Sequence, residues 1–555
     1  MNDPAQAAAP VPRGPARAAA LGGIILLWSL LYLPGLGGEE LKGEEPRRAL
    51  PGLAMVRSGD WVHPRVGGED YHRKPPLVNW LCAAGTLASG RVDEFSVRWP
   101  TTVLVLALGL ALALGVGRAA GPEAGFLAAV FALTNIGLLE KGRLAEIEGA
   151  YVALTGIAFA AWFGWVGGVP AARRRPWRGW AVGGLFLGLA FLAKGPPHLV
   201  MFYAVVVAVL GRGHRWRELR HPAHFLGLAL AVAVALPWFL ASAAAPPAAG
   251  GGAGGTAPAA AWWDQIRTRL DFTSIDWPSW ALQILQGVAN FLPWALLLVP
   301  LCLPPLRRRW QVDDPQRLVP GLVLGVVAGY FLIALTPASH GRFTMPLTGP
   351  ASALVAVALC QGKAWTAWAR PWRRTLIVLC YLVAAAGAGS LVWAGHQGAV
   401  PLPWLALGGS WLACLLAWRL AHRPGHWPLA AASGVLCVAV LVLYVQVAQP
   451  FKAGRENIRP IARAVGETLL PGETAVVYRG GIQPWVFYLW GRVVEVASRD
   501  DLPRPLPGPL VLRRAQWVKE LEKLEQRYGS VDRIVPVENL WDPAKPLVVV
   551  RFSGR

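Results

Sequence analysis

Residues 99–117, WPTTVLVLALGLALALGVG, decide the fold, because nineteen consecutive positions carry no charged side chain. A helix needs about 20 apolar residues to cross the roughly 30 Å hydrocarbon core of a bilayer. The whole 555-residue chain has the same character, with 54% hydrophobic residues, 15% charged residues and a mean hydropathy of +0.41. A soluble domain has about 25% charged residues. The composition therefore excludes a soluble globular enzyme and a disordered chain, and it predicts a polytopic α-helical membrane protein.

Thirteen segments meet or approach the length of a membrane span. They lie near residues 18–37, 99–118, 122–139, 149–167, 179–194, 196–211, 222–243, 282–304, 319–336, 344–361, 374–395, 401–419 and 428–448. Little more than Gly195-Pro196-Pro197 separates the fifth segment from the sixth. A count that differs by one or two therefore stays open.

Arginines concentrate in alternate turns between these segments, for example at 173–178, 212–220 and 307–309. Cytoplasmic loops of membrane proteins carry such an excess of cations. The pattern places the N-terminus inside, and most acidic residues then fall on the outer side. The net charge of +21 is thus explained by topology rather than by nucleic-acid binding.

Two domains are expected. Residues 1–448 form the transmembrane domain, with an outer catalytic loop at about 38–98, and residues 449–555 form a small α/β domain outside the membrane. The tail contains three apolar runs typical of strands and one amphipathic helix, at Thr474–Tyr478, Val493–Val496, Pro546–Phe552 and Arg514–Tyr528. It has no Gly-rich phosphate loop and no triad spacing, which favours a docking or stabilising module.

Charged side chains beside a bilayer are unfavourable unless they are paired or functional. Four groups of them fall on the predicted outer face, within 43–77, 140–148, 194–197 and 340–343. Cations there suit a leaving phosphate, and a carboxylate suits an acceptor or the positive charge that develops on a sugar. The alternative is that these charges only pair with one another and anchor helix ends.

Six short motifs punctuate these groups. They are Glu44-Glu45 followed by Arg47, the segment Gly59-Asp60-Trp61-Val62-His63-Pro64, the turn Lys74-Pro75-Pro76-Leu77, the acid that opens the fourth span, Lys194-Gly195-Pro196, and Arg342-Phe343 before Met345-Pro346. In these motifs the chain resembles the polyprenyl-phosphate-sugar glycosyltransferases, which include protein mannosyltransferases and lipid A aminoarabinose transferases. The resemblance implies the membrane-embedded GT-C fold with about 13 transmembrane helices and an outer C-terminal domain.

The resemblance also implies site residues. Glu44 matches the principal catalytic carboxylate, Glu45 matches the acid that follows, and Glu148 matches a second acid, with Glu146 as the competing choice. Lys74, Lys194 and Arg342 match candidate phosphate-binding positions. Further candidates for substrate binding are Arg47, Tyr71, Arg143 and Glu146.

Two departures from the family pattern bear on the chemistry. Glu44 stands where the family usually has aspartate, which moves the carboxylate about one methylene outward. Arg73 stands where many aminoarabinose transferases have glutamate, so the acceptor stays open.

No metal and no other cofactor are expected. His221 and His224 share one predicted turn, and His63 and His72 share another, but neither pair belongs to a His-Glu-x-x-His or Cys-x-x-Cys motif. A donor carried on a lipid phosphate also needs no diphosphate-bound magnesium.

The expected function is that of a bacterial inner-membrane glycosyltransferase. It would move a sugar from undecaprenyl phosphate to an acceptor on the periplasmic face, and 4-amino-4-deoxy-L-arabinose with lipid A phosphate is the leading pair. The expected partners are this donor, lipid A or another periplasmic acceptor, and the bilayer. A protein or another glycan remains an alternative acceptor. A lipid or solute transporter is the second alternative, which the absence of an internal sequence repeat disfavours.

The charge pattern predicts the topology. A periplasmically active phosphatase fused after residue 448 should be active, whereas the same enzyme fused after Arg174 should be inactive, because cationic turns are retained in the cytoplasm. Enzyme activity per amount of fusion protein is the measurement. The reverse pattern would move every candidate site residue to the cytoplasmic face.

Overall fold

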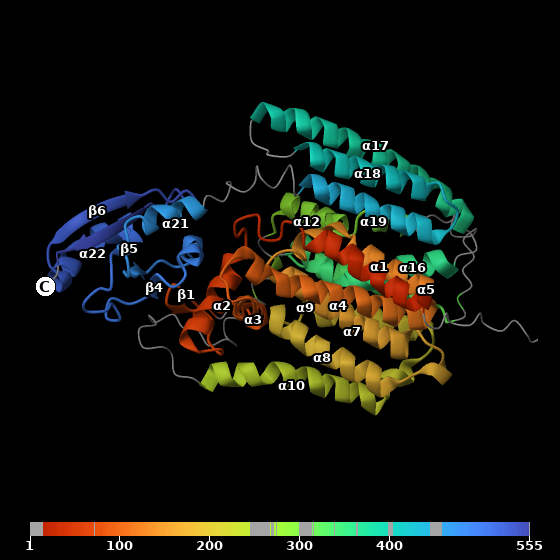
Figure 1. Cartoon of the computed structure of the whole chain (residues 1–555). Coiled ribbons are helices and arrows are strands. Elements are labelled where there is room, and N and C mark those ends of the chain that lie inside the picture. Colours follow the sequence, from red (N-terminus) through yellow and green to blue (C-terminus); the bar gives the residue numbers. More distant parts are fainter. Residues whose placement is uncertain are drawn as a thin grey trace, which may run out of the picture.

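The computed structural model describes residues 15–71, 73–244, 267, 271–272, 275–298, 314, 316–337, 339–361, 365–397, 403–444 and 458–553. Figure 1 shows a body of helices with a sheet domain, in blue, at one end, beside α2 (Pro46–Ser58) and α3 (Leu77–Ser89). The expected boundary at 448/449 lies outside the described residues.

Each of the thirteen predicted segments coincides with helix over part or all of its length. The helices of the body are α1 (Pro15–Tyr32), α4 (Glu94–Ala120), α5 (Pro122–Leu133), α6 (Ile136–Lys141), α7 (Ile147–Trp162), α8 (Pro176–Lys194), α9 (Pro197–Arg212), α10 (Pro222–Ala244), α12 (Trp277–Ala289), α15 (Leu318–Ala334), α16 (Thr348–Gln361), α17 (Trp365–Gln397), α18 (Pro403–Ala421) and α19 (His426–Leu443). The last part of the 282–304 segment lies outside the described residues.

Four helical runs among the described residues are long and apolar enough to cross a membrane by length and composition: Glu94–Ala120, Ile147–Gly167, Pro222–Ala244 and Gly341–Gln361. Other apolar helices are shorter, so the count of thirteen spans stays a prediction. The apolar window of Ile147–Gly167 is 94% buried and that of Pro222–Ala244 is 22% buried. α7 is therefore central, and α10 lies on the outside of the body, as Figure 1 shows.

Glycine allows the closest helix contacts. A methyl group at Gly115 of α4 would lie 2.2 Å from the carbonyl oxygen of Ala160 in α7, and one at Gly125 of α5 would lie 2.2 Å from that of Ala113 in α4. Small residues let helix backbones approach closely. In a bilayer the hydrophobic effect does not drive helices together, so such close packing contributes to their association.

The predicted outer loop at 38–98 is folded rather than extended. It contains α2, α3 and a short antiparallel hairpin of β1 (Arg65–Val66) and β2 (Glu69–Asp70). Pro46 begins α2 at a position where its missing N–H is not needed, and Gly59 ends the helix in the left-handed conformation at φ 71°. α2, α3 and the rest of this loop, with the turn just before it, thus form a small layer between the helical body and the sheet domain, called the outer layer below.

The C-terminal domain has a five-stranded mixed sheet in the order β4-β3-β5-β7-β6. Its elements are α21 (Ile458–Gly466), β3 (Ala475–Tyr478), β4 (Val493–Val496), β5 (Leu510–Arg513), α22 (Arg514–Tyr528), β6 (Val531–Val537) and β7 (Leu547–Phe552). The three strands and the amphipathic helix predicted from sequence are confirmed. β5 and β6 were not among the predicted strands; β6 is mostly exposed, so it lacks a continuous apolar run.

The sheet domain docks on the outer layer through both polar and apolar contacts. Glu40 accepts hydrogen bonds from the backbone N–H groups of Ile458 (3.0 Å) and Arg459 (3.1 Å) at the start of α21. A carboxylate is favourable there because the first N–H groups of a helix have no partner inside the helix. Arg459 also forms an ion pair with Glu94 at the start of α4. Apolar residues of both parts share one core cluster, which supports a docking role for the tail.

Glu495 in β4 lies in this interface. Burial raises the pKa of its carboxyl to about 7, although nearby Arg57 of α2 and the backbone N–H of Gly67 oppose the shift. Its Oε1 has no hydrogen-bond partner among the described residues. Arg57 donates instead to the carbonyl of Val493 at 2.6 Å.

The raised pKa predicts a pH-dependent stability. The folded protein keeps the Glu495 proton up to about pH 7, whereas the unfolded chain loses it near its ordinary value, so this group destabilises the fold progressively as pH rises from about 4.5 to 7. Glu495→Gln removes the charge. Its melting temperature relative to wild type should be higher at pH 8.0 than at pH 5.5. An equal difference at both pH values would contradict the assignment.

Candidate active site

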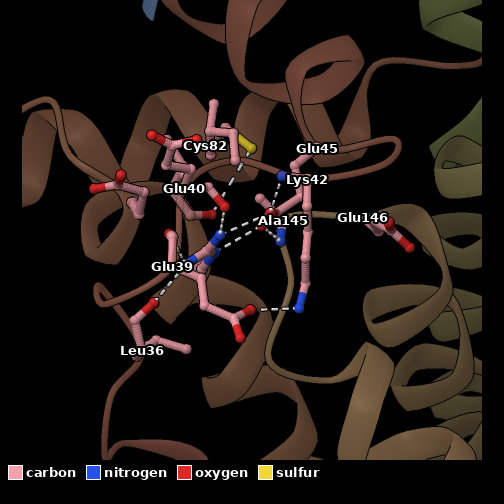
Figure 2. Close-up of polar contacts among 12 residues, drawn as sticks. Leu36, Glu39, Glu40, Lys42, Glu45, Cys82, Ala145 and Glu146 are labelled. Carbon is pink, nitrogen blue, oxygen red and sulfur yellow. Dashed lines mark hydrogen bonds and ion pairs between the residues drawn. The ribbon is translucent and has the colours of Figure 1, made fainter. Parts of the chain in front are cut away.

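The outer layer is held in place by the buried guanidinium of Arg98 in α4. Figure 2 shows its partners Leu36, Glu39, Glu40 and Glu45 gathered around one point. It donates to the carbonyl oxygens of Leu36 (2.8 Å), Glu39 (3.0 Å) and Glu40 (3.0 Å). Its other two N–H groups bind the two oxygens of Glu45, both at 2.7 Å. All five donors of the side chain are therefore used.

Glu45 completes this network from the other side. It is 0% exposed, and besides Arg98 its carboxylate accepts from the backbone N–H groups of Lys42 (3.0 Å) and Ala145 (2.9 Å). With four donors in place, both oxygens are occupied. The catalytic role expected for Glu45 is therefore not supported by its surroundings: the side chain ties the chain around residue 42 to the start of α7.

Glu44 is placed differently from its neighbour. Its side chain is 29% exposed, and it pairs with Arg47 at 2.9 Å and with Arg48 at 3.8 Å. Its backbone N–H donates to Oε1 of Glu146 at 3.3 Å. The close approach to Glu146 uses Gly43, whose φ is +56° and where a methyl group would lie 3.0 Å from that oxygen. Glu44 thus keeps an accessible carboxylate at the edge of the site.

Glu148, Lys194 and Arg342 come together from three separate elements. Lys194, the last residue of α8, donates to Glu148 of α7 at 2.9 Å, and Nε of Arg342 lies 3.4 Å from the same carboxylate oxygen. Arg342 belongs to a 3₁₀ turn, η6 (Gly341–Leu347). The aromatic rings of Tyr151 and Phe343 flank the Lys194 ammonium at 5.5 and 4.6 Å. This cluster has one cation in excess.

Glu146, at the N-cap position of α7, interacts with both groups of charges. Its carboxylate forms an ion pair with Lys141 at 3.0 Å and accepts from Glu44. Burial raises the pKa of Glu146, and the charge of Glu148 adds to this effect while Lys141 opposes it. Lys141 was not among the predicted site residues, although it precedes Glu146 by only five positions.

Three other predicted residues have different surroundings. Arg143 is buried and donates to the carbonyl oxygens of Leu31 and Pro34, which indicates a structural clamp rather than the expected substrate contact. Tyr71 lies under the guanidinium of Arg48, at 5.7 Å. Lys74 is partly buried just before α3.

Arg48 is a residue that the sequence reasoning missed. Its side chain is 4% exposed, and its Nε and one terminal nitrogen have no hydrogen-bond partner among the described residues. Two unsatisfied donors beside Glu44 suit an anionic ligand. Its position next to Arg47 in the same motif is the one signal that could have indicated it.

A polar cavity of about 230 Å³ opens beside Arg342. It is lined by Gln283, Gln286, Asn290, His340, Gly341 and Arg342. Amide side chains can donate hydrogen bonds to hydroxyl groups and accept them from hydroxyl groups, and the arginine can donate to a phosphate. Among the described residues, no three His, Cys, Asp or Glu side chains gather as a metal site.

Comparison with known proteins identifies the fold. The chain superposes with a TM-score of 0.70 on the crystal structure of ArnT from Cupriavidus metallidurans bound to undecaprenyl phosphate, over 97% of this chain and 98% of that one, at 18% sequence identity. The chain has the GT-C fold. The helical body and the small sheet domain of this GT-C protein therefore agree with the expected fold class.

Sequence relatives point the same way. The profile of the dolichyl-phosphate-mannose-protein mannosyltransferase family matches residues 73–240 of this GT-C chain. An undecaprenyl phosphate-alpha-4-amino-4-deoxy-L-arabinose arabinosyl transferase of Pseudomonas aeruginosa (strain UCBPP-PA14) is 27% identical over 343 residues, 61% of this chain and 59% of the relative. One from Sodalis glossinidius is 28% identical over 449 residues, 77% of this chain and 75% of the relative. The resemblance to polyprenyl-phosphate-sugar glycosyltransferases is thus confirmed.

The two adjacent carboxylates should respond differently to neutralisation. Glu45→Gln leaves the buried Arg98 without its counter-charge, so we expect a loss of about 3–5 kcal/mol of stability. Glu44→Gln removes a partly exposed pair and should change stability by less than about 1 kcal/mol. Thermal unfolding of the purified full-length variants is the measurement. Similar melting temperatures for both would disprove the division into a structural and an accessible carboxylate.

Proposed function

We propose that this chain is an inner-membrane glycosyltransferase that moves a sugar from undecaprenyl phosphate to an acceptor at the periplasmic face. The leading pair is 4-amino-4-deoxy-L-arabinose and lipid A phosphate, because relatives of the chain bear the name of that arabinosyl transferase. The observation that carries the proposal is the cluster of Glu148, Lys194 and Arg342, which presents an excess of positive charge at one end of the helical body.

This cluster suits a leaving phosphate. The side chains of Lys194 and Glu148 are each 6% exposed, so water screens their charges weakly. When the bond between the sugar C1 and the phosphate oxygen breaks, undecaprenyl phosphate departs with added negative charge. Lys194 and Arg342 stabilise that charge, while Glu148 keeps both cations oriented before the donor arrives. Lys74 is proposed as a third phosphate contact.

Glu44 is proposed as the carboxylate that faces the acceptor. An acceptor hydroxyl must lose a proton as its oxygen attacks C1, and Glu44 would take that proton as general base. A phosphate of lipid A is already ionised and has no such proton. Glu44 would then offset the positive charge that develops on the sugar ring. Arg47 and Arg48, which both pair with this carboxylate, would bind the phosphate of such an acceptor.

The cavity beside Arg342 is proposed to receive the sugar. Gln283 and Asn290 are already engaged, since Gln283 accepts from the N–H of Gly341 at 2.8 Å and Asn290 donates to its carbonyl at 2.8 Å. These two residues would hold η6, and with it Arg342, against α12. The third amide of the lining, that of Gln286, is proposed to contact hydroxyl or amino groups of the sugar.

Lipid A from cells that lack the gene tests this function. Complementation with the wild type should restore an added aminopentose on lipid A, detected by mass spectrometry. Lys194→Met should lower that modification by about 100-fold or more, because a cation aimed at the departing charge is lost. Lys519→Met, an identical change at an exposed position of the sheet domain, is the matched control and should behave as wild type.

The other outcomes separate the alternatives. Unchanged lipid A together with lost glycosylation of a protein or another glycan would replace the acceptor while retaining the reaction. If cells that lack the gene still glycosylate lipid A, proteins and other glycans normally, the transferase assignment is contradicted and a transporter is favoured. Equal expression and equal melting temperature of Lys194→Met and Lys519→Met exclude a general folding defect.

A further inference from the structure

A second cavity, of about 290 Å³, lies at the opposite end of the helical body from the candidate active site. Its lining comes from the turn before α8, the end of α9 and the start of α15. Lys194 of the candidate site is at the other end of α8, whose 19 residues span about 28 Å. The two sites are thus separated by roughly the thickness of a membrane core.

The cavity is strongly cationic. Its charged and amide lining residues are Arg174, Arg212, His214, Arg215, Gln316 and Arg317. Glu218 pairs with Arg174 at 2.6 Å, and the carboxylate of Asp314 is taken by the N–H groups of Leu318 and Val319. In the described part of the chain, no carboxylate forms an ion pair with Arg212 or Arg317. Arg174 is paired with Glu218, and Arg215 donates to the carbonyl oxygens of residues 166, 167 and 169. Arg212 and Arg317 are therefore the guanidinium groups of this lining that favour an anion.

Two further features mark this cavity. His214 and Arg317 both have φ of +53°, in the left-handed region that residues other than glycine rarely adopt, and such backbone conformations often occur at ligand sites. Oε1 of Gln316 is buried without a hydrogen-bond partner among the described residues. Burial, with Arg174 nearby, lowers the pKa of Arg215 to about 10, as expected for a guanidinium whose charge is incompletely compensated.

Exposed tryptophans indicate the level of the cavity relative to the bilayer. Trp177, at the start of α8, is 55% exposed, and Trp216, just after α9, is 50% exposed. Tryptophan is enriched at the level of lipid headgroups. A phosphate at this depth therefore belongs to a lipid more readily than to a dissolved anion.

We propose that this cavity binds the phosphate headgroup of an anionic phospholipid such as phosphatidylglycerol. Guanidinium groups of Arg212 and Arg317 bind the phosphodiester oxygens, and a headgroup hydroxyl donates to the buried amide oxygen of Gln316. A cavity of this size is at the lower limit for small-molecule sites, which fits a headgroup whose acyl chains stay in the bilayer. Basic pockets between helices are known means of binding anionic lipids. The proposal is independent of the transferase reaction.

Native mass spectrometry of the purified full-length chain tests the site. The double variant R212Q/R317Q should need about 10-fold or more phosphatidylglycerol for half-saturation, because each removed cation weakens binding to an anionic headgroup severalfold. The matched control R178Q/R220Q removes two exposed arginines of the same end that do not line the cavity. It should bind as wild type. Phosphatidylcholine should bind poorly to all three proteins.

Four outcomes would overturn the proposal. Equal loss in both double variants would indicate a diffuse cationic surface, and equal binding of the two lipids would remove the preference for an anionic headgroup. Displacement of phosphatidylglycerol by excess inorganic phosphate, with phosphate alone binding as tightly, would indicate a dissolved anion as ligand. If R212Q/R317Q does not fold, R212Q and R317Q measured singly should each show a smaller, additive loss; no loss in either would also reject the site.

Discussion

The arrangement of the outer layer depends on one buried interaction, the pair of Arg98 and Glu45. A guanidinium inside protein is stable only when its charge and all its N–H groups are satisfied. Here the loop of residues 36–40 supplies three carbonyl oxygens and Glu45 supplies the counter-charge. Because Glu45 also accepts from Ala145, the same interaction fixes the first outer segment to the start of α7. The positions of Glu44 and Glu146 follow from that attachment.

The network explains why two neighbouring glutamates behave differently. Glu45 points into the buried pair and uses its full capacity as an acceptor, whereas Glu44, one residue away, lies at the accessible edge with Arg47 and Arg48. Neutralising a buried partner leaves an uncompensated charge in a poorly solvated place, while neutralising a partly exposed one does not. Adjacent acids in a motif can therefore have separate structural and chemical roles.

Charge is divided between the two ends of this helical body. At one end Glu148, Lys194 and Arg342 share a partly buried cluster, and at the other Arg212 and Arg317 face a cationic cavity. Apolar, closely packed helices such as α7 and α16 occupy the space between. The two sites are about 28 Å apart along α8, which is roughly three Debye lengths at physiological ionic strength, so a phosphate bound at one end has little direct effect on a phosphate at the other.

The sequence by itself determined the helical segments, the strands β3, β4 and β7, and the residue types of the candidate site. Hydrophobic runs and alternation are local properties, and they show directly in the order of residues. Only the tertiary structure decided which charges meet. Glu148 is 46 positions from Lys194 and 194 positions from Arg342, and Arg98 is 53 positions from Glu45. Whether a carboxylate is a buried counter-ion or an accessible reactant depends on the donors that packing brings to it. Sequence spacing carries no information about those donors when they come from different helices.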